Sequence, residues 1–146
     1  VKALESGEYE SCHLSTQNLT ALVVDDNDVN RMVVHAMLNK LKIKNVVFAS
    51  GQALLNALQE EKISFDFILM DCEMPELNGY QTTGLYRQWE SDQGLKKKPI
   101  IALTAHAEVS YLNRCIESGM SDYMIKPLDL NKLLFKLQQH LPSISE

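Results

Sequence analysis

The amino-acid sequence predicts an α/β fold, a five-stranded parallel sheet with helices on both faces. From Leu19 onward, an apolar run followed by an amphipathic stretch occurs five times, the order that builds parallel strands with crossover helices. The apolar runs are continuous, which is typical of strands covered on both faces. At 146 residues, the chain is long enough for one domain with a proper core.

Composition narrows the classes of function. The net charge is −5, so there is no general electrostatic case for binding nucleic acid or an anionic membrane. No apolar run approaches the roughly 20 residues that span a bilayer. The three cysteines, Cys12, Cys72 and Cys115, fit no metal or disulfide spacing and indicate a reducing compartment. We therefore expect a cytoplasmic domain whose partners are proteins.

The ends of the chain differ from its centre. Residues 1–18 are polar, without a clear period and without a signal-peptide core, so we expect a tail or linker there. The first residue is Val1 rather than Met, which suggests a piece of a longer protein. We expect one domain over 19–141 and a C-terminal tail over 142–146.

The first half of the domain contains two strand and helix pairs. The apolar run "LTALVV" predicts a strand, and the next stretch, 28–41, has apolar residues at helical spacing. These residues are Val29, Met32, Val33, Ala36 and Met37. The β-branched run "NVVFAS" predicts the second strand. Ser50 is the expected N-cap of a helix over 51–61, where Leu54, Leu55 and Leu58 share a face.

The third strand is expected in "FDFILMD", followed by a helix from about Gly79 to Trp89. Pro99 begins the fourth strand, where its missing N–H is tolerated. The next helix has Val109, Leu112 and Ile116 at helical spacing.

Gly119 then ends that helix as a C-cap, and "DYMIK" predicts the fifth strand. Asp129 is the expected N-cap of the last helix, whose leucines form one stripe. They are Leu130, Leu133, Leu134, Leu137 and Leu141.

Polar residues follow directly where four of these strands end. They are Asp25 and Asp26 after the first strand, Asp71 at the third, Thr104 at the fourth and Lys126 at the fifth. In such a sheet, ligands bind beyond the carboxyl ends of the strands. Three carboxylates need a compensating cation, and Mg²⁺ prefers hard oxygen ligands. An Asp carboxylate can also attack phosphorus, and the transferred group then needs metal, ammonium and hydroxyl partners. We therefore predict that Asp71 accepts a phosphoryl group.

The chain from about Leu19 to Leu141 resembles a response-regulator receiver domain. The matching motifs are "VVDDN" at 23–27, "MDCEMPELNGY" at 70–80, "LTA" at 103–105 and "KP" at 126–127. The order, spacing and strand context of these motifs agree with that family, which makes the resemblance specific. It implies a flavodoxin-like doubly wound sheet with strand order 2-1-3-4-5.

The resemblance implies roles for the acids. Asp71 corresponds to the phosphorylated aspartate of the family. Asp26 corresponds to its direct acidic Mg²⁺ ligand, and Asp25 to the acid that binds the ion through water. The backbone carbonyl of Glu73 corresponds to the remaining protein ligand of the metal.

The resemblance also implies roles outside the acid cluster. Thr104 and Lys126 correspond to the groups that hold the phosphoryl oxygens, and the bond from Lys126 to Pro127 to a cis peptide. Tyr123 corresponds to an aromatic residue that changes rotamer on activation, although a strand tyrosine could also do nothing but pack. His106 lies two residues past Thr104 and could influence access to the phosphoryl group.

The motif at 70–80 is most similar to receivers attached to hybrid sensor histidine kinases. This similarity implies a phosphorelay, with a histidine kinase domain as donor and a histidine phosphotransfer protein as acceptor. The parent protein could be anchored in a membrane that this domain does not itself contact. Whether the domain counts as an enzyme stays open, because it would catalyse only its own phosphorylation and dephosphorylation.

Three alternatives remain. A free single-domain response regulator would signal by binding a protein. A Mg²⁺-dependent phosphatase would use Asp71 as nucleophile and Glu73, two residues later, as acid/base, but Asp25 and Asp26 argue against it. An inert receiver-like module would serve only as an interaction surface, which the complete set of acids, Thr104 and Lys126 argues against.

Overall fold

The computed structural model describes residues 18–60 and 63–141. The expected C-terminal tail and positions 1–17 of the expected N-terminal tail lie outside the described residues. The described chain forms one parallel sheet with strand order β2-β1-β3-β4-β5, as predicted. None of the helices in the described chain is long and apolar enough to cross a bilayer.

Each strand lies where an apolar run predicted one. The bounds are Thr20–Val24 for β1, Lys44–Phe48 for β2, Phe67–Asp71 for β3, Ile100–Thr104 for β4 and Asp122–Ile125 for β5. Every residue of β3 and β4 is buried, because both strands lie inside the sheet and are covered on both faces. β2 lies at an edge and is more exposed.

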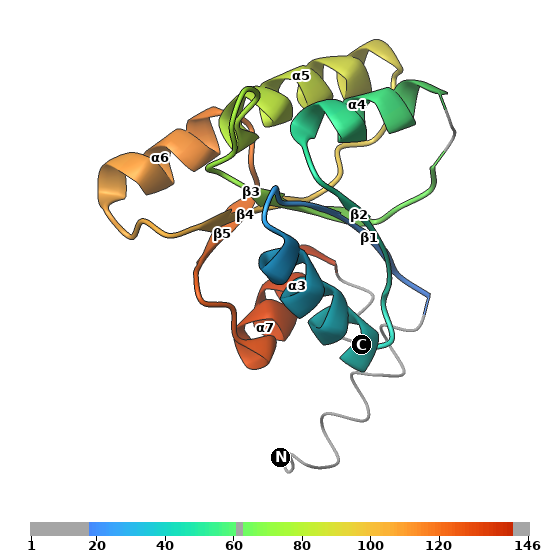
Figure 1. The fold of residues 1–146 in the computed structure, drawn as a ribbon. Helices are drawn as coiled ribbons and strands as arrows, with labels where there is room; N and C mark the ends of the chain where they lie inside the picture. The colour runs from blue at the N-terminus through green and yellow to red at the C-terminus, as the bar shows by residue number, and fades with distance from the viewer. Residues whose placement is uncertain (1–17, 61–62, 142–146) are drawn as a thin grey trace.

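Helices alternate with the strands along the described chain. Their bounds are Asp28–Lys40 for α3, Gly51–Glu60 for α4, Gly79–Asp92 for α5, Val109–Glu117 for α6 and Leu130–His140 for α7. Figure 1 shows α3 and α7 on one face of the sheet and α4, α5 and α6 on the other. Two apolar clusters result, one on each face.

The helix caps largely follow the prediction. The Ser50 hydroxyl oxygen accepts a hydrogen bond from the Ala53 N–H at 3.0 Å. The Asp129 carboxylate accepts from two N–H groups in the first turn of α7. Asn78 and Gln81 form a capping box at the start of α5, which fixes the predicted helix start because it satisfies two otherwise free N–H groups.

The packed face of α3 differs from the one that the helical spacing indicated. Val29, Met32 and Val33 are 65%, 70% and 48% exposed, whereas Val34 and Leu38 are buried. Two apolar stripes run along this helix. The stripe of Val34 and Leu38 completes the cluster against the sheet, so the other stripe faces outward.

The helix α6 shows the same difference. Val109 and Ile116 are 70% and 50% exposed, whereas Cys115 is buried. The sheet is contacted by one narrow side of this helix, so only that side is covered. Gly119 follows the helix with φ of +112°, a conformation that favours glycine and ends the helix as predicted.

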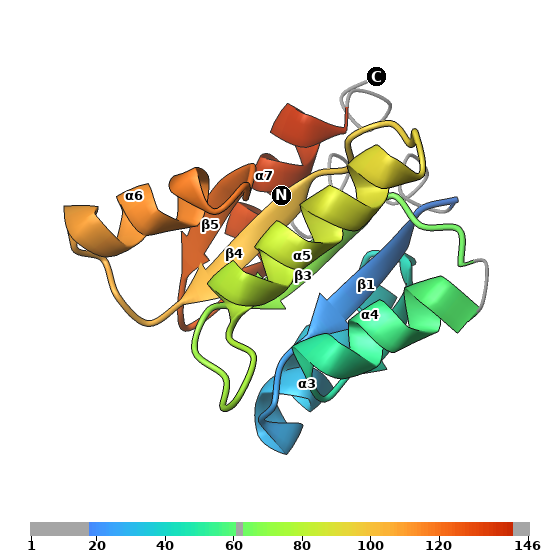
Figure 2. The same ribbon diagram turned by 90° about the horizontal axis from the view of Figure 1, so that it is seen from above.

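The start of α5 lies directly against the end of β3. A Cβ atom on Gly79 would lie 2.2 Å from the backbone carbonyl oxygen of Asp71 and 2.8 Å from the Cα of Cys72. Only glycine therefore allows this approach. In Figure 2, the turn into α3 and the loop after β3 lie at the same side of the sheet, where the strands end and the predicted site residues lie.

Candidate functional site

The three predicted acids lie together beyond β1 and β3. One carboxylate oxygen from each of Asp25, Asp26 and Asp71 lies within 4.8 Å of the other two. The two strands are parallel neighbours, with Val24 opposite Met70, so Asp71 at the end of β3 lies next to the acids that follow β1. Asp25 and Asp71 are buried and Asp26 is exposed. The cluster therefore has a buried base and an open side.

The carboxylate of Asp25 is only half satisfied. Its Oδ1 accepts a hydrogen bond from the Asn27 N–H at 2.9 Å. Its Oδ2 is buried and has no hydrogen-bond partner among the described residues. The Lys126 Nζ lies 3.8 Å from this oxygen, which is too far for a hydrogen bond. A buried carboxylate oxygen without a partner indicates a site for a cation.

The carboxylate of Asp71 has one occupied and one available oxygen. Its Oδ1 accepts from the Lys126 Nζ at 3.0 Å and from the Glu73 N–H at 3.3 Å. Within the described part of the chain, no group donates to its Oδ2. Burial raises the pKa of Asp71 to about 6, because the hydrogen bond from Lys126 only partly offsets burial and the negative charge of Asp25 adds to it.

Lys126 remains a cation at the centre of this arrangement. Burial lowers its pKa, but the hydrogen bond to Asp71 and the negative charges of Asp71 and Asp25 outweigh burial and raise it. One ammonium does not balance three carboxylates, and the negative charge of Asp25 adds to the effect of burial on the pKa of Asp71. The negative charge of the three carboxylates exceeds the positive charge of Lys126, and this excess favours a further cation.

The donor set fits Mg²⁺. Three carboxylates supply hard oxygen ligands, which this ion prefers. The backbone carbonyl of Glu73 accepts no hydrogen bond from the residues that the structure describes, so it too is available. The unpartnered Oδ2 of Asp25 is the observation that most directly favours a bound cation.

Thr104 and His106 form the next part of the site. Thr104 is fully buried at the end of β4, and its Oγ1 accepts a hydrogen bond from the His106 N–H at 3.1 Å. The His106 ring lies 3.8 Å from the Glu73 carboxylate and 3.9 Å from that of Glu108. It also stacks on Tyr111, with ring centroids 4.1 Å apart. His106 thus lies beside the site, as the sequence indicated.

The structure places Tyr123 outside the acid cluster. It is half-buried on β5 and opposite Ala102 of β4. The Lys136 Nζ lies 5.3 Å from the centroid of its ring. The peptide bond between Lys126 and Pro127 is cis, as the resemblance implied.

Sequence reasoning did not single out Arg31. Its Nη1 donates to the backbone carbonyl of Asp25 at 2.6 Å, and its Nη2 pairs with the carboxylate of Asp28. The only signal in the sequence was a basic residue in the first helical turn after the acids. A basic residue there opposes the helix dipole, which is a reason to look for a specific partner.

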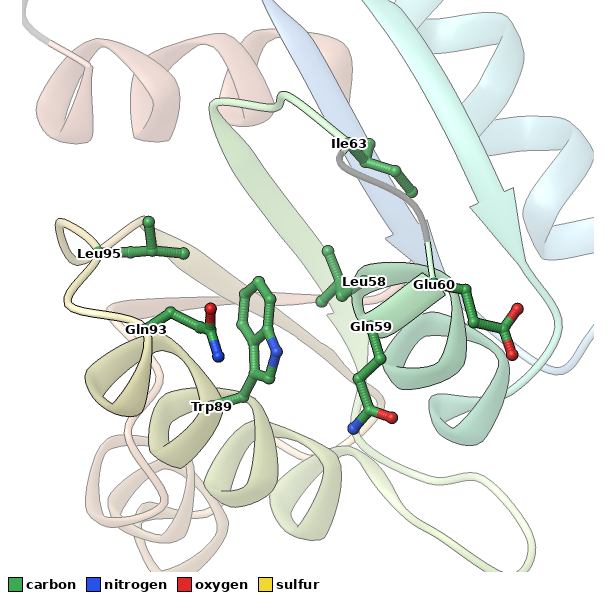
Figure 3. Close-up of a pocket in the computed structure, with 7 residues that line it drawn as sticks. All are labelled: Leu58, Gln59, Glu60, Ile63, Trp89, Gln93 and Leu95. Carbon is green, nitrogen blue, oxygen red and sulfur yellow. The ribbon is translucent and has the colours of Figure 1, made fainter.

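A cavity of about 800 Å³ lies near the amino ends of the strands, where α4 and α5 end. Figure 3 shows the residues that line it, among them Leu58 and Trp89. Its polar lining residues are Gln59, Glu60 and Gln93, which form neither an acid cluster nor a nucleophile with a base. The candidate functional residues therefore lie at the carboxyl ends of the strands and not beside this cavity.

The fold and the site define a flavodoxin-like α/β domain with a cluster of three carboxylates, one of which pairs with a lysine. Residues 21–138 match the family described as the response regulator receiver domain, and the chain belongs to that family. It is therefore a receiver domain of two-component signalling.

The similar proteins include sensor kinases. The chain is 39% identical over 120 residues to sensor histidine kinase GacS of Pseudomonas protegens, an alignment that covers 82% of this chain and 13% of GacS. The chain thus spans only a small part of that relative. It is 35% identical, with a TM-score of 0.73, to the receiver domain of sensor histidine kinase PA1611 from Pseudomonas aeruginosa. That structure has a magnesium ion coordinated in its active-site cleft, and the alignment covers 88% of this chain and 98% of that one.

A third similar protein was solved in a complex. The receiver domain of the Saccharomyces cerevisiae response regulator Ssk1 was crystallised with the histidine phosphotransfer protein Ypd1. The similarity has 27% sequence identity and a TM-score of 0.78, and covers 86% of this chain and 90% of that chain.

Proposed function

We propose that this receiver domain takes a phosphoryl group from a phosphohistidine onto Asp71 and passes it to a histidine phosphotransfer protein. The observation that carries the proposal is the arrangement at Asp71. Its Oδ1 is held by Lys126 at 3.0 Å, while its Oδ2 has no donor among the described residues. One oxygen is thus fixed and the other is available to react.

In the proposed reaction, Oδ2 of Asp71 attacks phosphorus as the bond from phosphorus to the imidazole nitrogen breaks. The imidazole leaves with the electron pair, and Asp71 becomes an acyl phosphate. Because its pKa is about 6, most Asp71 carboxylates are ionised and nucleophilic at neutral pH. Lys126 and the Thr104 hydroxyl would donate to phosphoryl oxygens and offset their charge.

Mg²⁺ would be held at the acid cluster. Asp26, Asp71 and the Glu73 carbonyl are the proposed direct ligands, with Asp25 binding through water. When bound, the ion neutralises negative charge on the phosphoryl oxygens. The unpartnered Oδ2 of Asp25 and the magnesium ion in the similar PA1611 receiver support this assignment.

The surface beside the cluster suits a protein partner. Val29, Met32 and Val33 are exposed on α3, directly after the turn that carries the acids. A cavity of about 160 Å³, lined by residues such as Leu103 and Leu128, adjoins this helix. An exposed apolar stripe favours burial by a partner. The similarity to Ssk1, which was crystallised with Ypd1, supports a phosphotransfer protein as that partner.

The setting is proposed from the relatives. The aligned region makes up 13% of GacS, which supports a receiver that forms one domain, over 19–141, of a hybrid sensor histidine kinase. A kinase domain would then be the phosphoryl donor. The domain would act in the cytoplasm, whether or not a membrane anchors the parent protein.

A conformational switch would follow phosphorylation. The Thr104 hydroxyl would move toward the phosphoryl group on Asp71, and Tyr123 on the adjacent strand could then turn inward. The position of Tyr123 supports this proposal, because it is half-buried and pairs with Ala102, two residues before Thr104 on the adjacent strand.

A labelling experiment tests the proposed function. The wild-type chain, Asp71→Asn and Lys126→Ala are incubated with a radiolabelled small phosphodonor, with and without Mg²⁺. With Mg²⁺, we expect label on the wild type, at least tenfold slower labelling of Lys126→Ala and no label on Asp71→Asn. Without Mg²⁺, we expect no label on any of the three. Label on Asp71→Asn would contradict the proposal.

The alternatives give other results in the same assay. Rapid turnover of a small phosphomonoester would favour a phosphatase. The labelled chain is next mixed with a histidine phosphotransfer protein such as Ypd1. Transfer of the label supports the phosphorelay, whereas a stable label that no such protein accepts favours a free single-domain regulator.

A further inference from the structure

We infer that Arg31 is a positioning residue, which holds the peptide between Asp25 and Asp26 and so aims both carboxylates at the cation site. The inference rests on the proposed function, since it takes the acid cluster to bind Mg²⁺. Nothing in the receiver motifs requires this arginine. Its role comes from its contacts.

Three of the four polar atoms of Asp25 have fixed partners. Its N–H donates to the Phe48 carbonyl at 3.1 Å, and its Oδ1 accepts from Asn27 at 2.9 Å. Its backbone carbonyl accepts from the Arg31 Nη1 at 2.6 Å. Only Oδ2 has no hydrogen bond among the described residues, and the Lys126 Nζ lies 3.8 Å from it. Arg31 therefore supplies one of three contacts that leave a single oxygen for the cation.

The orientation of Asp26 depends on the same contact. In the described chain, the Asp26 carboxylate makes no hydrogen bond or ion pair, and the residue is exposed. The carbonyl of Asp25 and the N–H of Asp26 belong to one planar peptide unit. A hydrogen bond that fixes the carbonyl of Asp25 also fixes the orientation of this peptide plane. The plane in turn sets the direction in which the Asp26 side chain projects from the backbone.

Arg31 is itself well anchored. Its second terminal nitrogen pairs with Asp28 in the same helical turn, and its backbone N–H donates to the Asn27 carbonyl at 3.0 Å. Its side chain is only 20% exposed. The guanidinium is planar with donors in a fixed fork, so one side chain links the end of β1 to the first turn of α3.

Charge and positioning make opposite predictions for Mg²⁺. If Arg31 acted only as a nearby positive charge, its removal would tighten the binding of a divalent cation by removing repulsion. If it positions Asp25 and Asp26, its removal weakens Mg²⁺ binding, because the two carboxylates are no longer held pointing toward the cation site. The sign of the change in affinity therefore separates the two roles.

The test is a calorimetric titration with Mg²⁺ and no phosphodonor. It compares the wild type with Arg31→Ala, Arg31→Lys and the control Lys40→Ala. Lys40 ends the same helix, so its removal changes the net charge equally. We expect Arg31→Ala to weaken binding roughly tenfold, as is usual for residues that orient metal ligands. Arg31→Lys should keep most of the affinity, because an ammonium can still donate to the Asp25 carbonyl. Lys40→Ala should bind like the wild type.

Equal or tighter binding by Arg31→Ala would overturn the inference while leaving the proposed function intact. A wild-type chain that binds no Mg²⁺ would overturn both. Urea unfolding shows whether each variant is folded. If Arg31→Ala is not, Arg31→Met replaces it, because methionine has a similar apolar stem and no hydrogen-bond donor. Binding by Arg31→Met as tight as the wild type's would overturn the inference.

Discussion

Lys126 donates a hydrogen bond to the Asp71 carboxylate at 3.0 Å, although β4 lies between their two strands in the sheet. The lysine side chain therefore reaches across the end of β4, where Thr104 is buried. This contact brings the nucleophile and two groups that would receive the phosphoryl oxygens to one place. It also partly offsets the cost of burying the Asp71 carboxylate, whose pKa burial raises to about 6.

The first prediction concerns the stability of the metal-free domain. The pKa of Asp71 is raised from 3.8 to about 6, so the folded chain binds this proton more tightly than the unfolded chain. The resulting stability is complete below about pH 4 and is lost as the pH rises through about 6. We expect Asp71→Asn to gain about 3 kcal/mol relative to wild type between about pH 4 and pH 7, because one pKa unit corresponds to about 1.4 kcal/mol.

Urea unfolding with a chelator at both pH values measures this difference. Asp92→Asn, an exposed change in α5, is the control and should stay within about 0.5 kcal/mol of wild type. If the difference in unfolding free energy between Asp71→Asn and wild type does not grow with pH, ionised Asp71 does not destabilise the folded domain.

The second prediction separates the two acids after β1. Asp26 is proposed as a direct ligand and Asp25 as a ligand through water, so Asp26→Ala should weaken Mg²⁺ binding more than Asp25→Ala. Both substitutions remove one negative charge, which makes them matched controls for each other. Calorimetric titration gives both dissociation constants, and affinities equal to that of wild type would refute the assignment.

The third prediction concerns an ion-pair cluster that joins β5 to α7. Asp122 accepts from the Lys136 Nζ and the His140 Nε2, each at 2.9 Å. Burial raises the pKa of Asp122, but these hydrogen bonds outweigh burial and hold it below its usual range. Its stabilisation is present above that range and is lost as the pH falls through the folded pKa.

We expect Asp122→Asn to lower the free energy of unfolding by about 1 to 2 kcal/mol at neutral pH. The loss should shrink in acid, where the wild-type carboxyl becomes protonated. Urea unfolding across acidic pH measures the trend, and a loss that is independent of pH would indicate packing rather than charge.

The fourth prediction concerns signal transmission. Beryllofluoride with Mg²⁺, which mimics a phosphoryl group on Asp71, should shift the NMR signals of Thr104 and Tyr123. The same addition to Asp71→Asn should shift neither. If the mimic binds the wild type without changing either residue, Tyr123 only packs on β5, and phosphotransfer can proceed without the switch.

The positions of the candidate site residues were more predictable from the sequence than the helix faces were. Asp25, Asp26, Asp71, Thr104 and Lys126 all lie at the end of a strand or directly after it. A parallel sheet brings these ends together regardless of which helix face packs against it. The outward face of α3 could not be predicted, because Val29, Met32 and Val33 are as apolar as the stripe that packs. Only the contact with the sheet selects between the two stripes.

The role of Arg31 could not be predicted from the sequence for a different reason. Its partner is the backbone carbonyl of Asp25, and every residue has such a carbonyl, so side-chain chemistry in the sequence gives no sign of it. The close approach of Gly79 to Asp71 is of the same kind. Both contacts depend on where a helix begins relative to a strand end, which only the folded chain determines.

The most direct measurement of the central claim is to locate the phosphoryl group. The wild-type chain is labelled with a small phosphodonor and Mg²⁺, the acyl phosphate is reduced with borohydride, and the peptides are analysed by mass spectrometry. The account predicts one modified residue, Asp71, and no modified peptide from Asp71→Ala. A phosphoryl group on a serine or histidine, or labelling that survives in Asp71→Ala, would contradict it.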